Sequence, residues 1–118
     1  MERWALVSGL QGDLDLYEQI QKDLKRQRGI ASLLVLGDLI GPQRNCNALL
    51  DRLRQPKPAD LAPECIYGWW EEQLLAESGY RGDRKADNLR QQQGDDGVNQ
   101  LLAAVDSSHL NWLASLQF

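Results

Sequence analysis

Long apolar runs and cysteines are scarce in this sequence. No apolar run approaches the roughly 20 residues that are needed to span a bilayer, so we do not expect membrane insertion. The 118 residues contain two cysteines, and no charged and then apolar leader opens the chain. We therefore expect a cytoplasmic protein in which Cys46 and Cys65 are free thiols.

Basic residues are also too few for a nucleic-acid-binding protein. The sequence has 13 lysines and arginines against 17 aspartates and glutamates, which gives a formal net charge of -4. Because these cations form no basic block, we expect no nucleic acid partner. The length fits a single domain, 1–118, that is large enough to bury a hydrophobic core.

Three short apolar segments that end at glycines indicate β-strands at 4–8, 30–36 and 64–67. The middle segment runs directly into Gly37 and Asp38, so we expect it to deliver one carboxylate to the carboxyl edge of a sheet. A helical segment separates each strand from the next, and such β-α-β units are parallel. The predicted class is α/β, with a small parallel sheet of about three strands and flanking helices.

Apolar residues at helical spacing predict the helices, and Asp13 is the expected N-cap of the first one. The predicted helical segments are 13–28, 46–54, 69–75, 98–105 and a last one that starts near Ser107 or Ser108. We divide the domain into a β-α-β-α-β-α core at 1–77, a polar segment at 78–97 and C-terminal helices at 98–118. The polar segment is either a mobile loop or a marginal helix, and we favour a partly helical excursion.

The three strand ends carry recognisable motifs. They read Ser8-Gly9-Leu10-Gln11-Gly12-Asp13, Leu36-Gly37-Asp38-Leu39-Ile40-Gly41 and Gly68-Trp69-Trp70-Glu71. Their spacing resembles that of the calcineurin-like metallophosphoesterases, especially the small bacterial branch with S-D-x-H-G-N, L-G-D-x-x-G and G-N-H-D. The resemblance covers nearly the whole chain, and it implies a truncated metallophosphoesterase-like sandwich.

The family that the chain resembles uses a two-metal site, and most of the matching ligands are missing here. Gly9 stands where the first Asp is expected and Gln11 where the His is expected, while Trp69 and Trp70 replace the Asn and the catalytic His. Only Asp38 remains, and the family's second half, which supplies further histidines, is absent. Because one carboxylate cannot hold two divalent ions, we predict a pseudoenzyme with no phosphoesterase activity, no metal and no cofactor.

Two weaker metal hypotheses can be stated from the residues that remain. Asp38 together with Asp13 and Glu71 could hold one hard cation through oxygen, although acids near helix starts are more typical of caps and dipole partners. The single histidine, His109, falls in the last predicted helix. We expect it to be a partly exposed helix residue rather than a ligand.

The adjacent tryptophans lead to the main functional prediction. Large aromatic residues are enriched at binding hot spots. If the ligand cleft of the family persists in outline, Trp69 and Trp70 lie at its mouth. In addition, a parallel sheet is normally covered on both faces, so the last helices, a second copy or another protein must cover the second face. We predict a protein-binding or scaffold module that binds a protein partner, a second copy of itself, or both, with contacts at Trp69, Trp70 and Glu71 and a second candidate surface at 80–88.

Two alternatives remain open from the sequence. In the first, the chain is a sensor that binds a phosphate- or nucleotide-like molecule against Gly9, Gly12, Gly37 and the start of the first helix. Asp13 and Asp38 argue against this sensor because they would repel an anion. The second alternative is a weak phosphoesterase with a rearranged single-metal site.

Overall fold

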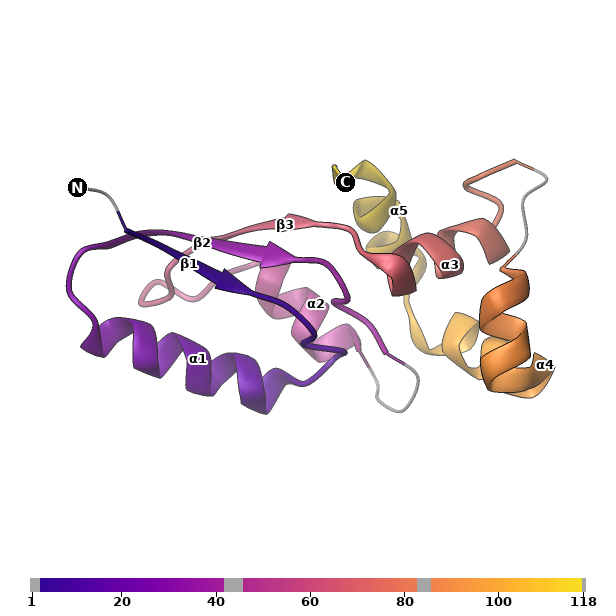
Figure 1. Cartoon of the computed structure of the whole chain (residues 1–118), viewed down its shortest axis with the longest axis horizontal. Coiled ribbons are helices and arrows are strands. Elements are labelled where there is room, and N and C mark those ends of the chain that lie inside the picture. The colour runs from indigo at the N-terminus through magenta and orange to yellow at the C-terminus, as the bar shows by residue number, and fades with distance from the viewer. Residues whose placement is uncertain (1–2, 42–45, 83–85, 118) are drawn as a thin grey trace.

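The computed structural model describes residues 3–41, 46–82 and 86–117 of the chain. The molecule is elongated, with extents of 45 × 24 × 23 Å, and Figure 1 shows the sheet in one half and the C-terminal helices in the other. The elements in chain order are β1 (Arg3–Val7), α1 (Leu14–Arg26), β2 (Ile30–Leu36), α2 (Asn47–Arg54), β3 (Pro63–Ile66), α3 (Trp69–Glu77), α4 (Asp87–Ala104) and α5 (Ser107–Ser115).

The three strands form a parallel sheet in the order β1-β2-β3, which confirms the predicted α/β class. Leu6 of β1 lies beside Leu34 of β2, and Val35 of β2 lies beside Cys65 of β3. Both outer strands begin one residue earlier than the sequence predicted. Because the three strands are parallel, their carboxyl ends lie at the same sheet edge.

Helix α1 starts and ends where its local signals indicate. The Asp13 carboxylate accepts a hydrogen bond from the Leu16 N–H at 3.0 Å, as an N-cap should. After Arg26 the chain turns through Gly29, whose φ of +77° lies in the left-handed region that favours glycine. Because these signals are local in sequence, this helix could be predicted almost completely.

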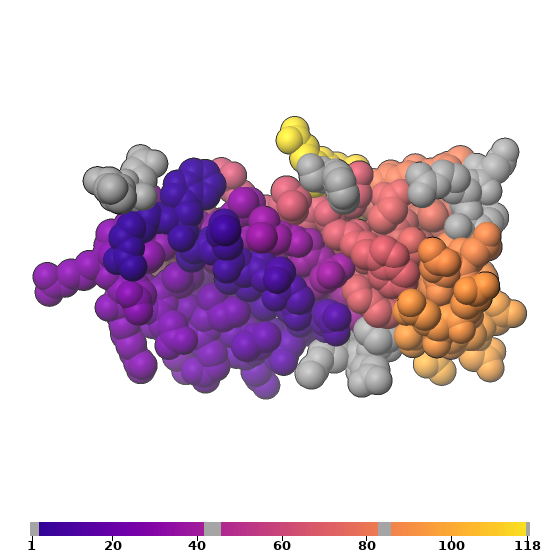
Figure 2. Space-filling model, in the orientation of Figure 1, coloured from indigo at the N-terminus to yellow at the C-terminus, as the bar shows by residue number. Residues whose placement is uncertain are grey.

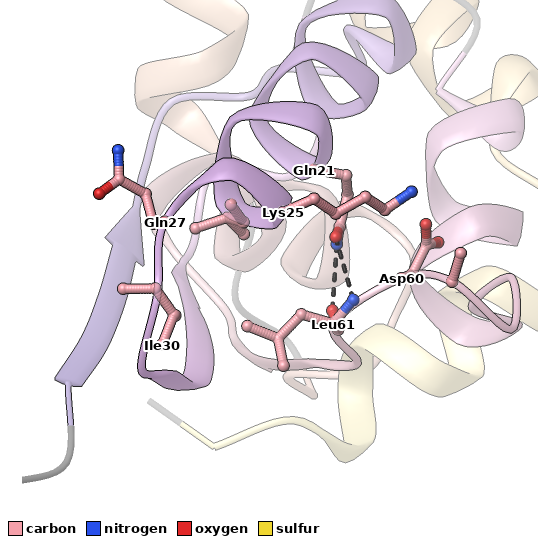
Figure 3. A pocket seen from close by; sticks show the side chains of 8 residues that line it. Gln21, Lys25, Gln27, Ile30, Asp60 and Leu61 are labelled. Carbon is pink, nitrogen blue, oxygen red and sulfur yellow. Dashed lines mark hydrogen bonds between the residues drawn. The ribbon is translucent and has the colours of Figure 1, made fainter.

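A side-chain amide ties α1 to the loop before β3, as Figure 3 shows. The Gln21 Nε2 group donates to the Leu61 carbonyl and its Oε1 accepts from the Leu61 N–H, both at 3.0 Å. The neighbouring hollow of about 270 Å³ is lined by this pair, by the stem of Lys25 and by Asp60. It lies at the amino-terminal side of β2, away from the three motifs.

Helix α2 buries the apolar face that the sequence predicted. Cys46, Leu49, Leu50 and Leu53 are all buried. On its other side, Arg52 makes two hydrogen bonds to the Asp60 carboxylate, at 2.6 and 2.9 Å, and a third to Glu18 of α1 at 3.2 Å. One guanidinium thus joins α1, α2 and the loop that leads to β3.

Only one face of the sheet is fully covered. Figure 1 shows α1 and α2 on the same side of the sheet, where Leu33 and Val35 are buried beneath them. The other side, here called the open face, carries exposed Trp4, Leu6 and Leu36. Helix α5 flanks the β3 side of the open face across a groove of about 430 Å³ that Leu34, Ile66, Trp112 and Leu116 help to line.

The C-terminal half is more helical than the sequence indicated. The predicted helix at 98–105 begins at Asp87, so most of the polar segment is helical, as favoured, with a kink at Gly94. Residues 83–85 of that segment lie outside the described residues. Within the described ranges, no helix is both long and apolar enough to cross a membrane.

The prediction that His109 is partly exposed is wrong. Its side chain is buried, and its Nε2 lies 2.8 Å from Asp51 Oδ1 while its Nδ1 lies 3.1 Å from Arg54 Nη1. Since a guanidinium can only donate, Nδ1 accepts and Nε2 carries the proton toward Asp51. The same guanidinium lies 5.8 Å from the centre of the Trp112 ring. The histidine therefore joins α5 to α2.

Candidate functional site

The loops after β1 and β2 are joined through their backbones. The Gln11 N–H donates to the Asp38 carbonyl at 2.9 Å, and the Gly12 N–H donates to the Leu39 carbonyl at 2.8 Å. The contact is so close that a Cβ atom on Gly41 would lie 2.6 Å from the Cβ of Gln11. The first two motifs therefore meet at one sheet edge, as the topology predicts.

The loops after β2 and β3 also approach each other closely, here through backbone atoms on both sides. A Cβ atom on Gly37 would lie 2.6 Å from the Cα of Gly68, and one on Gly68 would lie 2.6 Å from the backbone nitrogen of Asp38. Gly37 also has a φ of +82°, so it needs glycine for both reasons. The third motif thus lies directly against the second.

The Asp38 carboxylate serves the start of α3. Its Oδ1 accepts a hydrogen bond from the Trp70 N–H at 3.2 Å. The residue itself has a φ of +50°, which is uncommon outside glycine and is tolerated best by Asn and Asp. Asp38 therefore satisfies an N–H group in the first turn of α3, where a negative charge is also favoured by the helix dipole.

Glu71 holds the second and third motifs together from inside the protein. Its Oε1 accepts from the Gly68 N–H at 2.7 Å and its Oε2 accepts from the Ile40 N–H at 3.2 Å. The side chain is completely buried. Burial raises the pKa of Glu71 to about 7, and the nearby Asp38 charge adds to this rise while the two backbone hydrogen bonds oppose it.

The two tryptophans have different environments. Trp69 is exposed, whereas Trp70 is partly buried and packs against the hydrophobic core. Their rings meet edge to face, with centroids 5.2 Å apart and planes at 90°. Trp70 thus supports an indole that faces solvent.

The donor set does not fit the metal site that the resemblance implies. Among the described residues, no group of three or more His, Cys, Asp or Glu side chains is placed to hold a metal ion. Asp13 caps α1, Asp38 caps α3 and Glu71 is buried on two N–H groups. The hypothesis that these three acids share one hard cation is therefore wrong for the described structure.

The loop before α1 is poorly suited to binding phosphate. The N–H groups of Gln11, Gly12 and Asp13 donate to the carbonyls of Asp38, Leu39 and Leu10. An anion site at a helix start needs such N–H groups to point at the ligand. The sensor hypothesis therefore gains no support from this loop.

The thiols offer no catalytic nucleophile. Cys46 and Cys65 are free, as the composition predicted, and Cys46 is buried. Burial and, to a smaller extent, the Glu71 charge together raise the pKa of the Cys65 thiol to about 12. A thiol needs a lowered pKa to react readily near pH 7.

The second candidate surface begins with Tyr80. Its ring is exposed, and its hydroxyl is hydrogen-bonded to the Asn111 side chain. The adjacent Arg81 donates to both oxygens of Glu72 and lies over the Tyr67 ring, 5.5 Å from its centre. The start of this surface is thus attached to α3 and α5.

Sequence reasoning missed the role of Glu71, which we had placed on the contact surface. One signal was available, because Glu71 is three residues after Gly68, the spacing at which a glutamate reaches back to the N-cap N–H. No sequence signal indicated the contact with Ile40, which is 31 residues away. Its burial follows from that long-range contact.

Comparison of the chain with protein-family models, with curated protein sequences and with solved structures finds no match. The relationship to metallophosphoesterases that the motif spacing suggests therefore stays a prediction.

Proposed function

We propose that this chain is a catalytically inactive, metallophosphoesterase-like domain that works as a protein-binding or scaffold module in the cytoplasm. Its contact surface centres on Trp69, with Trp70 as the support behind it. Glu71, which the sequence predicted as a contact residue, does not belong to this surface because its side chain is buried.

The proposal rests on one observation at the sheet edge: two acids accept hydrogen bonds from the backbone, whereas a tryptophan side chain beside them is exposed. Asp38 and Glu71 direct oxygens at backbone N–H groups, whereas a two-metal phosphoesterase directs them at divalent ions. Trp69 is 38% exposed and is held by an edge-to-face contact. A rigid, partly exposed aromatic side chain is typical of a protein-binding hot spot.

A single substitution tests the surface better than the removal of both indoles. Because Trp70 packs against the core, its truncation would damage the fold as well as any contact. We would use Trp69→Ala, with Trp69→Phe as the conservative variant. Tyr80→Ala is a matched control, since Tyr80 is 37% exposed and begins the second candidate surface.

The experiment is affinity capture of the tagged full chain from its native extract, followed by calorimetric titration of the purified partner. We expect Trp69→Ala to weaken binding by about 30-fold or more, which corresponds to a hot-spot loss of about 2 kcal/mol. Trp69→Phe should retain most of the affinity, and Tyr80→Ala should retain nearly all of it. Loss of binding with Tyr80→Ala alone would move the contact to the second surface, and no stoichiometric partner would refute the proposal.

The predicted lack of phosphoesterase activity is tested separately. We expect no hydrolysis of a nitrophenyl phosphodiester with Mn²⁺, Ni²⁺ or Zn²⁺. Metal-dependent hydrolysis that Asp38→Asn abolishes would show that the chain is an enzyme after all.

A further inference from the structure

The outer edge of β1 is an unpaired strand edge. Among the described residues, β1 has a neighbour only on its β2 side in the sheet order β1-β2-β3, whereas the opposite strand is extended by a bridge between Ile66 and Gln117. Figure 2 shows the indigo surface of β1 at the front of the molecule with no other described segment over it. An unpaired edge offers a row of N–H and C=O groups to another strand.

From Trp4 to Val7, this edge lacks the features that usually block pairing. Between its register shift at Arg3 and its end at Val7, β1 contains no proline and no charged residue. Trp4 is 53% exposed and Leu6 is 63% exposed. Natural edge strands are usually protected by prolines, inward-pointing charges or bulges along their length, so this one is suited to pairing.

Helix α1 continues the apolar surface below the edge. Successive helix residues are about 100° apart, so Leu16 lies roughly 160° around the helix from Glu18. Glu18 faces α2, because it contacts Arg52. Leu16, which is 43% exposed, therefore lies on the flank of α1 away from α2, on the β1 side of the molecule.

We propose that the β1 edge is the interface between two copies of this chain, which pair antiparallel about a two-fold axis to form a six-stranded sheet. This inference does not depend on the proposed protein-binding function, since it uses none of the residues around Trp69. A two-fold axis at Ala5 allows all five residues of β1 to pair. Trp4 of each copy then lies opposite Leu6 of the other, on the open face.

The pairing is self-complementary in size and in charge. Ala5, the smallest residue of the strand, meets its own copy at the axis, and each Trp4 gains an aliphatic cross-strand neighbour. Arg3 of each copy lies opposite Val7 at the two ends of the paired region, so the two guanidinium groups are kept apart. No like charges therefore face each other across the axis within β1.

The available surface predicts a weak dimer. Trp4, Leu6 and Leu16 together expose roughly 300 Å² per copy. If about 60% of such an interface is apolar, the total buried area is about 1,000 Å², just below the range of stable complexes. We therefore expect dissociation in the micromolar range.

Sedimentation velocity of the full chain over a concentration series tests the proposal. We expect a species of twice the 13.4 kDa chain mass that dissociates on dilution. Leu6→Lys should raise the dissociation constant by at least about tenfold. Leu36→Lys is the matched control, because Leu36 is an exposed leucine on the same face but belongs to the central strand.

The register is tested with a charge pair. In the double variant Trp4→Glu/Leu6→Lys, each introduced carboxylate lies opposite an introduced ammonium of the other copy, so we expect the double variant to lose less affinity than the sum of the losses of the two single variants. A parent that stays monomeric up to millimolar concentration would overturn the proposal. It would also be overturned if Leu36→Lys dissociated the dimer as strongly as Leu6→Lys, which would indicate stacking of the open faces, or if the affinity losses of the two single variants simply added in the double variant.

Discussion

Replacement of Glu71 by Gln tests whether one buried carboxyl sets the pH dependence of stability. The pKa of Glu71 is about 7 in the folded protein against an ordinary value of 4.5. Because the folded state holds the proton more tightly, the contribution of Glu71 to stability is greatest below pH 4.5 and falls as pH rises to about 7. At about 1.4 kcal/mol per pH unit, this interval corresponds to a loss of about 3 kcal/mol.

The variant removes this titration but retains the shape of the side chain. The amide of Glu71→Gln can accept from one of the two backbone N–H groups, but its NH₂ group opposes the other. We therefore expect a cost of about 1–3 kcal/mol that is independent of pH. The parent should be clearly more stable than the variant at pH 5. By pH 8 this advantage should have fallen by about 2.5 kcal/mol.

Urea unfolding at several pH values, followed by tryptophan fluorescence, measures this difference directly. Glu71→Met is the control: it removes both the charge and the acceptors, so its offset should be larger while its change with pH should match that of Glu71→Gln. A stability difference from the parent that stays constant between pH 5 and 8, or that widens as pH rises, would refute the assigned role of Glu71.

Two further predictions concern the scaffold. Gly37→Ala should lower the free energy of unfolding by at least about 2 kcal/mol more than Gly79→Ala does. Both glycines have positive φ, but only Gly37 faces another backbone segment. Equal losses for the two variants in chemical unfolding would contradict the close contact. Asp60→Asn should cost about 2 kcal/mol at pH 7, since the side chain is buried on Arg52. Hydrogen bonding to Arg52 lowers the pKa of Asp60 below 3.8, so this stability is present above pH 3.8 and is lost as pH falls through the lowered value, where parent and variant should converge.

The elements of the first half could be predicted from sequence because their signals are local. Asp13 stands directly before an amphipathic segment, and Gly29 stands directly after it. The strand at 30–36 is a short apolar run that ends in glycine. Each of these features needs only its neighbours along the chain to be read, and the structure confirms all three.

The environment of single polar residues could not be predicted in the same way. His109 is buried because Arg54, 55 residues earlier, provides a donor for its ring. Glu71 is buried because the loop after β2 closes over it and donates the Ile40 N–H. Whether a polar residue lies inside a protein depends on a partner that is distant in sequence, and the identity of the residue alone favours exposure.

The close backbone contacts at the strand ends bear on the proposed loss of catalysis as much as the missing ligands do. Two metal ions about 3.5–4 Å apart need space and several inward-facing side chains between the loops. Here Gly37 lies against Gly68 and Gly41 lies against Gln11, with no room for a Cβ atom at either glycine of the second motif. We therefore expect any binding function of this edge to lie on its outer surface, where Trp69 is exposed.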